Sequence, residues 1–447
     1  MVTYLPVKIR LSVLFILLSE QTIDFMIPTY LAYMMGGFLA DPSLSQSELE
    51  AKISYYSGTL EGLNRLMSFF GCLIWSTVSD KIGRKHSMMI VLCGIMIASI
   101  CFGLAPSYEI AVLCRMVAGL FGGTIPIAKA MLRDLSDDTN IAILYSYLGT
   151  GYGLAAVIGP LIGGLFSHPY RNFDFLNISI FYTYPYILPQ AIHASIIIFT
   201  LFLIYFCIPN KPPEPTSIQD TKGLASNKNY IISVIIFCMI AIVQFSYRLL
   251  MSLWVKVSRD IGGLGWEVEE YPGYMNSGSG VFIALFPFFL TPYLSQKYGV
   301  KKSCLITISF MIPVVFLISW CYLLYGIPMW ICLIILNGLS NALSTVFINF
   351  ISIAVSNSVS SNITGAALGI CQSATALCRS ITTGITGVLY GSNQGWDLPF
   401  PLDSHFMFIL IDFILIANFV FILAYMKPEL EKRKTTDEEI PLINKNN

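Results

Sequence analysis

Long apolar runs recur along the whole chain and are separated by short polar segments that hold most of the charged residues. A helix needs about 20 apolar residues to cross the hydrocarbon core of a bilayer. We therefore predict an all-α protein with twelve membrane-spanning helices. The expected spans run near 9–38, 55–79, 87–105, 109–133, 141–166 and 187–208, and then near 230–255, 273–294, 303–325, 329–355, 363–390 and 405–426.

A polar, proline-rich segment separates the sixth expected span from the seventh. It reads NKPPEPTSIQDTKGLASNKN from Asn210 to Asn229, a composition that behaves as a linker and not as a packed core. We therefore predict an N-terminal bundle over 1–208, a linker over 209–229, a C-terminal bundle over 230–426 and a tail over 427–447.

The composition excludes a soluble globular protein. Of 447 residues, 55% are hydrophobic and 12% are charged, whereas a soluble protein carries about twice that charged fraction. The formal net charge is zero, so no basic excess indicates nucleic acid as a partner. The first apolar run is too long for a cleaved signal peptide and contains Glu20 and Asp24, so we expect it to be retained as a span.

The eleven cysteines all fall within apolar runs. Small buried side chains are the simplest account of them, because no pair lies in a loop where an extracytoplasmic disulfide would form. No nucleophile–base pair and no set of metal ligands stands out along the chain. We therefore expect no enzyme, no bound metal and no cofactor.

Basic residues are distributed unevenly between the two sides of the predicted membrane. With a cytoplasmic N-terminus, seventeen of the 26 Lys and Arg residues fall in cytoplasmic segments, four on the other side and five within spans. Cytoplasmic loops of membrane proteins carry this excess of Lys and Arg. We therefore expect both termini and the linker to face the cytoplasm.

A short motif recurs after the second and the eighth expected spans. Residues 79–85 read SDKIGRK and residues 295–301 read SQKYGVK, which share S-x-K-x-G-x-K at a separation of 216 residues. The repeat predicts two pseudo-symmetric six-helix halves. Transporters built in this way bind their substrate between the halves, near the bilayer midplane.

The first copy of this motif resembles the loop signature of the major facilitator superfamily, G-x-x-x-D-[RK]-x-G-R-[KR]. Residues 76–85 read STVSDKIGRK, with serine at the first glycine and matches at Asp80, Gly83, Arg84 and Lys85. Gly83 suits a tight turn, and the basic residues favour the cytoplasmic side. The resemblance implies that Asp80 lies near the start of span eleven, where the helix dipole favours an anion, and so latches the halves together.

Two further motifs extend the resemblance into the spans. Arg115 is followed four residues later by Gly119 in the fourth span. In the fifth span the sequence GPLIGG matches the G-P-x-x-G-G motif of drug:proton antiporters at Gly159, Pro160, Gly163 and Gly164. Small residues let helices approach closely and proline bends a span, so packing alone explains the residue types; the resemblance adds antiport as an expectation.

Finer details resemble the branch that holds plant zinc-induced facilitators and fungal drug:proton antiporters. Trp75 precedes the loop motif, and residues 137–140 read DDTN before the fifth span. Gln372, Ser373 and Arg379 in span eleven match further positions of that branch. The resemblance covers essentially the whole chain and implies a twelve-helix fold that transports by alternating access.

Charged side chains inside a bilayer cost a few kcal/mol or more and are functional candidates. Glu20 and Asp24 lie one turn apart on the first span and share a face; they are our candidates for proton coupling, with Arg115 acting on a nearby carboxylate. The alternative is a structural ion pair between Asp24 and Arg115. Glu61 and Arg65 are spaced i, i+4 on the second span, and we expect them to neutralise each other.

Two arginines in the second half, Arg248 and Arg379, have few acidic candidates as partners within the spans. Asp412 in span twelve is the one we consider first. These three residues are our candidates for the substrate cavity. Two unpaired cations facing it would favour an anionic or carboxylate-bearing substrate.

Two short signals bear on the membrane in which the protein resides. Asn177-Ile178-Ser179 is a glycosylation acceptor in the loop after span five, on the predicted non-cytoplasmic side. In the tail, Glu438, Leu442 and Ile443 match E-x-x-x-L-[LI], the acidic dileucine signal that sorting adaptor complexes bind. We therefore favour an endolysosomal or vacuolar membrane over the plasma membrane.

Together these patterns predict a secondary active transporter, a proton-coupled antiporter of a small organic solute, a drug-like compound or a metal chelate. We expect a monomer whose partners are that solute, protons and the lipid bilayer. Facilitated uniport or symport by the same fold stays open, as does a transporter-like receptor without turnover. No local pattern names the substrate, because one fold carries many cargoes.

Overall fold

The computed structural model describes residues 6–135, 141–210, 224, 226–359, 364–393 and 405–426. Within these ranges the regular elements are helices. Large apolar side chains stand exposed on the outside of the bundle, among them Phe288, Ile327 and Phe413, which are 69%, 74% and 67% exposed. An apolar exterior of this kind suits lipid and not water.

The first half holds six crossings. They are α1 (Val7–Leu39), α2 (Gln46–Ile82), α3 (Arg84–Gly103), α4 (Tyr108–Leu120) continued by α5 (Thr124–Leu135), α6 (Ile141–Phe166) and α9 (Ile187–Cys207). Three short elements join α6 to α9, namely α7 (Pro169–Asn172), η1 (Asp174–Leu176) and α8 (Ser179–Thr183). The expected fourth span is thus interrupted between α4 and α5, where Gly122 and Gly123 pack against side chains of α2.

The second half also holds six crossings. They are α10 (Lys228–Trp254), the two parts of α11 (Glu270–Ile318), α12 (Gly326–Asn357), α13 (Thr364–Asn393) and α14 (Phe406–Tyr425), with short η3 (Arg259–Ile261) and η4 (Cys321–Leu323) in the connections. Helix α11 covers the expected spans eight and nine, and it changes direction at Gly299, where φ is 74° and ψ is 173°.

Hydropathy and length alone mark nine candidate membrane spans among the described residues. Two of these candidates each cover two pieces of structure. One includes α4 and α5, and another includes both parts of α11. The long helices α2 and α13 are not among the nine; α2 carries Glu61 and Arg65, and α13 carries Arg379. The twelve crossings predicted from the sequence are therefore the ones that the helices make.

Helix α2 begins at Gln46, earlier than the expected start near residue 55, because a capping box starts it there. Glu48 Oε2 accepts a hydrogen bond from the Ser45 backbone N–H at 2.9 Å, and Ser45 Oγ accepts from the Glu48 backbone N–H at 3.4 Å. These bonds satisfy backbone donors that a helix start would otherwise leave open.

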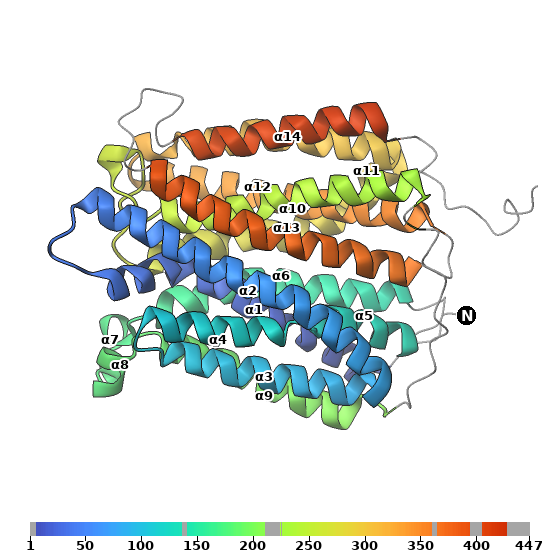
Figure 1. Ribbon diagram of the computed structural model, residues 1–447, viewed down its shortest axis with the longest axis horizontal. Coiled ribbons are helices and arrows are strands. Elements are labelled where there is room, and N and C mark those ends of the chain that lie inside the picture. The colour runs from blue at the N-terminus through green and yellow to red at the C-terminus, as the bar shows by residue number, and fades with distance from the viewer. Residues whose placement is uncertain are drawn as a thin grey trace, which may run out of the picture.

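Figure 1 shows the long helices lying side by side along one direction, with α3, α4 and α9 along one edge of the bundle and α14 along the other. The start of α1 lies at the same end as the turn from α2 to α3. We name this the basic end, since Lys81, Arg84, Lys85, Lys297 and Lys301 lie there, and the other the opposite end.

The two copies of the S-x-K-x-G-x-K motif occupy equivalent places. Gly83 follows α2 at φ 92° and Gly299 lies in α11 at φ 74°, a region of φ that favours glycine. Lys85 Nζ donates to the carbonyl oxygens of Tyr205 and Ile208 at 2.7 and 2.8 Å. Lys301 Nζ donates in the same way to the carbonyl oxygen of Leu423 at 3.2 Å.

In each half, therefore, one lysine caps the C-terminal end of the sixth helix, where open carbonyl groups and the helix dipole attract a cation. The equivalent contacts of Lys85 and Lys301 agree with the pseudo-symmetry that the repeat predicts.

The halves approach each other most closely toward the opposite end, along α2 with α13 and α6 with α11. A Cβ added to Gly58 of α2 would lie 2.7 Å from Gly387 Cα, and one added to Gly164 of α6 would lie 2.8 Å from Gly273 Cα. Nearer the basic end, an added Cβ on Gly149 or Gly369 meets no described atom within 4 Å. These close glycine contacts hold the two halves together toward the opposite end.

Candidate functional site

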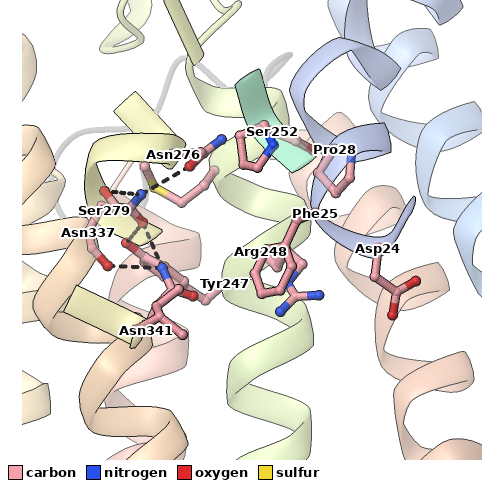
Figure 2. A pocket seen from close by; sticks show the side chains of 13 residues that line it. Asp24, Phe25, Pro28, Tyr247, Arg248, Ser252, Asn276, Ser279, Asn337 and Asn341 are labelled. Carbon is pink, nitrogen blue, oxygen red and sulfur yellow. Dashed lines mark hydrogen bonds between the residues drawn. The ribbon is translucent and has the colours of Figure 1, made fainter. Parts of the chain in front are cut away.

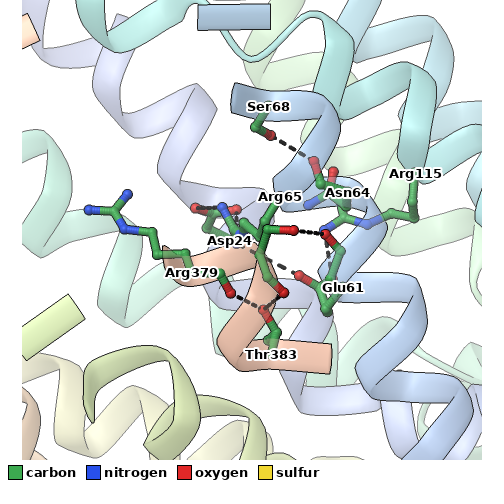
Figure 3. Close-up of polar contacts among 10 residues, drawn as sticks. Asp24, Glu61, Asn64, Arg65, Ser68, Arg115, Arg379 and Thr383 are labelled. Carbon is green, nitrogen blue, oxygen red and sulfur yellow. Dashed lines mark hydrogen bonds and ion pairs between the residues drawn. The ribbon is translucent and has the colours of Figure 1, made fainter. Parts of the chain in front are cut away.

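Four charged side chains from three helices of the first half meet in the centre of the bundle (Figure 3). Arg65 of α2 binds Asp24 of α1 with two parallel hydrogen bonds, from Nη2 to Oδ1 at 2.9 Å and from Nη1 to Oδ2 at 3.1 Å. Glu61 of α2 accepts from Arg115 Nη2 of α4 at 2.6 Å. A longer contact of 3.8 Å between Arg65 Nη2 and Glu61 Oε2 joins the two pairs.

The structure treats the two candidate pairings of these residues differently. The alternative pair of Asp24 with Arg115 does not form, because Arg65 binds Asp24 and Arg115 binds Glu61. Glu61 and Arg65 do form the expected i, i+4 ion pair, at 3.8 Å, but each also has a shorter contact with a residue on another helix. The i, i+4 rule describes neighbours on an isolated helix, whereas long side chains in a bundle can reach a partner on an adjacent helix.

The Glu61–Arg115 pair is deeply buried, at 7% and 3% exposure. One orientation of the Asn64 side-chain amide completes it, since the amide accepts from Arg115 Nη2 and donates to the Arg115 carbonyl oxygen, both at 2.9 Å. The Arg115 guanidinium also lies 5.8 Å from the centre of the Phe102 ring. A buried charge pair of this kind costs several kcal/mol if one partner is removed.

Glu20 lies one turn from Asp24 on α1, toward the basic end. Its Oε2 atom is buried and has no hydrogen-bond partner among the described residues. The charges of Asp24, Arg65 and Lys129 act on this carboxyl group. Glu20 is therefore near the ionic network without being an ion-paired member of it.

Phe245 of α10, which no sequence pattern singled out, joins the two halves at this level. Its ring centre lies 5.1 Å from the guanidinium carbon of Arg65, 5.4 Å from that of Arg248 and 4.8 Å from that of Arg379. The ring face attracts cations, so one aromatic side chain holds a first-half arginine beside two from the second half.

Between the halves lies a cavity toward the opposite end from this network (Figure 2). It is lined by thirteen residues of α1, α6, α10, α11 and α12: Asp24, Phe25, Pro28, Pro160, Tyr247, Arg248, Met251, Ser252, Asn276, Ser279, Ile283, Asn337 and Asn341. Figure 2 shows Arg248 between Asp24 on one side and the amide side chains of α11 and α12 on the other.

A hydrogen-bonded cluster centred on Asn337 forms one wall of the cavity. Asn337 Nδ2 donates to Asn276 Oδ1 and Ser279 Oγ, both at 3.0 Å. Its Oδ1 accepts from Tyr247 Oη and Asn341 Nδ2, both at 2.9 Å. All four bonds that a side-chain amide can make in this way are used, so Asn337 is a fixed hub.

The sequence contains one signal for this wall, a polar stripe on α12. The high overall hydropathy of the span conceals it. Asn337, Asn341, Thr345 and Asn349 recur every four residues in an otherwise apolar span, a spacing that places them on one helix face. Polar groups within a bilayer face the protein interior or a water-filled cavity. The two members nearest the opposite end, Asn337 and Asn341, line the cavity.

The three candidates for the substrate cavity lie in different surroundings. Arg248 lines it. Arg379 is not among its lining residues, and Figure 3 shows its guanidinium outside the hydrogen-bonded network. Asp412 of α14 is 6% exposed, and neither of its carboxyl oxygens has a hydrogen-bond partner in the described part of the chain. Asp412 therefore pairs with neither arginine.

The described contacts of the loop motif lie within its own half. Asp80 forms an ion pair with Arg84, Arg84 Nη1 donates to Ser79 Oγ, and Lys85 caps α9 as described above. The residues just before α13, over 360–363, lie outside the described part, so the expected latch between Asp80 and the start of span eleven stays a prediction.

The G-P-x-x-G-G motif of α6 packs on two helices at once. An added Cβ on Gly159 would lie 2.8 Å from the Thr22 carbonyl oxygen of α1, and Gly163 lies against Met26 and Thr29 of the same helix. Gly164 instead meets Gly273 of α11, in the other half. Pro160, between these contacts, lines the cavity.

At the opposite end a set of polar contacts centred on Glu269 joins the halves. Its Oε1 atom lies 3.0 Å from His168 Nδ1 and accepts a hydrogen bond from Tyr186 Oη at 3.3 Å, and Arg171 Nη1 lies 3.8 Å from Oε2. Burial opposes ionisation of Glu269, but the contact with His168 and the charges of His168 and Arg171 outweigh it, so the pKa of Glu269 is below its ordinary value.

Further contacts extend this closure. Asn172 Nδ2 donates to Glu270 Oε1 at 2.7 Å, and Tyr33 Oη donates to the Trp266 carbonyl oxygen at 2.9 Å. Lys256 Nζ donates to the Ala32 carbonyl oxygen at 3.0 Å. Burial lowers the pKa of Lys256 to about 8, although the carboxylates of Glu269 and Glu50 act in the other direction.

The two short signals are placed differently. Asn177 is exposed at the opposite end, where its Oδ1 accepts from Tyr182 Oη at 2.7 Å. The tail over 427–447, with Glu438, Leu442 and Ile443, lies outside the described residues. Among the residues that the structure describes, no group of His, Cys, Asp and Glu side chains could hold a metal ion.

Comparison with known proteins gives one consistent result. A family model described as the Major Facilitator Superfamily matches residues 11–383. ZINC INDUCED FACILITATOR-LIKE 1 of Arabidopsis thaliana is 24% identical over 397 residues, which cover 83% of each chain. Efflux pump azaK of Aspergillus niger is 24% identical over 274 residues, which cover 59% of this chain and 57% of that protein.

Among solved structures, the D-xylose-proton symporter superposes with a TM-score of 0.76 at 15% identity, over 96% of this chain and 99% of the other. At that identity the likeness shows the fold, which is two six-helix halves around a central cavity.

Proposed function

Since the chain belongs to the major facilitator superfamily and is thus a multi-pass membrane transporter, we propose that it exchanges protons for a small organic solute by alternating access. The observation that carries this proposal is the position of Asp24. Its carboxylate belongs to the central ionic network and also lines the cavity.

An exchanger must not carry proton and solute together. A carboxylate that faces the solute cavity provides a shared site, because a proton on it removes the charge that would hold a cationic group of the solute. Glu20, one turn nearer the basic end and without an ion-pair contact within 4 Å among the described residues, provides the next position for that proton on α1.

Protonation of Asp24 would also affect how the two halves pack against each other. A proton on Asp24 weakens its two charge-assisted bonds to Arg65. Arg65 lies over Phe245 of α10 together with Arg248 and Arg379. Release of Arg65 would therefore change the charge at the contact between the halves and so shift the equilibrium between the two states that alternating access requires.

Two further observations support exchange. The antiporter motif of α6 touches α1, the helix of Asp24, and α11 of the other half, so it lies at a joint that must open and close. Among the relatives, azaK bears the name of an efflux pump, and efflux driven by a proton gradient is exchange. We extend the range of cargoes to drug-like compounds and metal chelates because the sequence resembles drug:proton antiporters and zinc-induced facilitators.

We further propose that the basic end faces the cytoplasm, because it carries the excess of Lys and Arg. The structure then has its cavity closed on the luminal or external side. With the dileucine signal of the tail bound by sorting adaptors, the protein would reside as a monomer in an endolysosomal or vacuolar membrane. Protons leaving that compartment would drive the solute inward.

The test is uptake by proteoliposomes that contain the purified full chain. A panel of amines, organic anions, zwitterions and metal chelates is offered with and without an inside-acid pH gradient, and internal pH is followed with a trapped dye. Exchange predicts saturable accumulation together with loss of internal protons. Equilibration that ignores the gradient would replace exchange by uniport, a proton flux in the same direction as the solute would replace it by symport, and binding without flux would indicate a receptor.

A further inference from the structure

We infer that the cavity binds a zwitterionic solute, with its carboxylate on Arg248 and its ammonium group on Asp24; this assignment rests on the transport proposed above. Two of the residues that line the described cavity are charged, one carboxylate and one guanidinium. They come from opposite halves, Asp24 from α1 and Arg248 from α10. A solute that carries both charges would bind the halves together.

The surroundings of Arg248 favour the binding of a carboxylate. Its guanidinium carbon lies 4.7 Å from the centre of the Phe25 ring and 5.4 Å from that of Phe245, so aromatic faces hold the charged group. No carboxylate lies within 4 Å of it in the part of the chain that the structure describes. A guanidinium held by its face keeps its N–H donors for bidentate binding of a carboxylate in the ring plane.

Asp24 keeps acceptor capacity although Arg65 binds it. The two bonds from Arg65 use one site on each carboxylate oxygen, and an ionised carboxylate has about four such sites. An ammonium group of the solute can therefore approach the same carboxylate from the cavity. A proton on Asp24 would remove this interaction, which makes proton and solute alternatives at one residue, as exchange requires.

The amide wall adds selectivity for a polar solute. Asn337 is saturated, but Asn276 uses its Oδ1 atom and Asn341 uses its Nδ2 atom within the cluster. Among the described contacts, the Asn276 Nδ2 donors and the Asn341 Oδ1 acceptor have no partner. One donor and one acceptor beside the two charges suit a zwitterion with a further hydroxyl, amine or amide group.

The cavity differs from the one expected from the sequence, in which Arg248 and Arg379 both face the substrate. Two free arginines in the cavity would favour an anionic or carboxylate-bearing substrate, with no need for an ammonium group. Because Arg379 is not among the lining residues and Asp24 is, the cavity is complementary to a carboxylate and an ammonium group together.

The experiment uses a spacer series, namely glycine, β-alanine, 4-aminobutyrate and 5-aminovalerate, each with its methyl ester and its N-acetyl derivative. Binding is measured by thermal stabilisation of the purified full chain, and transport by counterflow in proteoliposomes. We expect one spacer length to bind best, with apparent affinity about tenfold or more lower for its ester and its N-acetyl form, the size of a charge-assisted hydrogen bond.

Two variants assign the groups. In Arg248→Gln the acid and its ester should bind equally, whereas in Asp24→Asn the free amine and its N-acetyl form should bind equally and the inhibition of binding at acid pH should disappear. Lys52→Gln, which removes one exposed charge of α2, is the control and should keep both preferences. A residue with only a structural role would lower the affinity for all members alike.

Equal transport of acid and ester by the unmodified protein, or a preference for the plain amine or plain anion, would overturn the zwitterion assignment while transport stood. Absence of saturable flux for every compound in the broader panel would instead remove the proposed function, and with it the premise of this site.

Discussion

Both carboxylate oxygens of Asp24 accept hydrogen bonds from one side chain, Arg65, which lies on the next helix. This contact places a group that can bind a proton in the cavity wall and connects it to Phe245 of the other half. The spacing of residues in the sequence predicts neither the contact of Asp24 with Arg65 nor the position of Arg65 beside Phe245.

We expect Asp24→Asn to abolish accumulation driven by the pH gradient, because an amide cannot bind and release the proton. Counterflow of solute without a gradient should persist, though with weaker binding of solute. Uptake into proteoliposomes at equal protein density, with and without an inside-acid gradient, measures both. Gradient-driven accumulation at the unmodified level in Asp24→Asn would remove Asp24 from the coupling and direct attention to Glu20.

Removal of Arg115 alone should damage folding more than coupling. Arg115→Ala leaves Glu61 buried without its 2.6 Å partner, and breaking such a pair costs about 3–5 kcal/mol. The double variant Glu61→Gln with Arg115→Gln keeps hydrogen-bonding groups and removes both charges, so it should recover most of the thermal stability in detergent. If the double variant unfolds as early as Arg115→Ala, the loss does not come from an unpaired Glu61.

Gly164→Leu should shift the bundle toward a state that is open at the opposite end. Its side chain would enter the space next to Gly273, and overpacking costs about 1–3 kcal/mol in the closed state. The shift would be measured as the distance between spin labels at Tyr182 and Tyr325, which are 55% and 72% exposed at that end. The protein labelled only at its native cysteines gives the background signal.

The control is Gly149→Leu in the same helix, where an added Cβ meets no described atom within 4 Å; its label distances should match the parent. An unchanged distance in Gly164→Leu would show that the glycine contact does not limit closure.

Closure at the opposite end should depend on pH in two separate windows. Glu269 has a pKa below its ordinary value in the closed state, so its contribution is present above that ordinary value and is lost as the pH falls through the lowered one. Lys256 has a pKa of about 8 in the closed state, below the ordinary 10.5, so a rise in pH above about 8 should favour closure.

Between these windows the closed fraction, measured with the same label pair, should change little through these two groups. Glu269→Gln should remove the acid window and leave the alkaline one, and Lys256→Met should do the reverse. An acid window that survives in Glu269→Gln would assign it to another group of this contact set, with His168 the next to test.

The sequence by itself determined the number of crossings, the division into halves and the family, because each follows from local composition or from a short linear motif. Apolar runs of sufficient length must cross a bilayer as helices, and a repeated motif such as that of Lys85 and Lys301 identifies equivalent positions without knowledge of the fold. Intramembrane Asp24, Arg115 and Arg248 could be selected in the same way, since burial of a charge in lipid is costly wherever it occurs.

Only the tertiary structure decided which of these groups meet. Arg65 binds Asp24 more closely than its helix neighbour Glu61. Arg379 and Asp412 lie outside the cavity lining, and Phe245 contacts three arginines that lie far apart in the sequence. The physical reason is that a helix sequence specifies a face, whereas partners depend on the rotation and distance of neighbouring helices, which the packing of residues such as Gly164 on Gly273 sets.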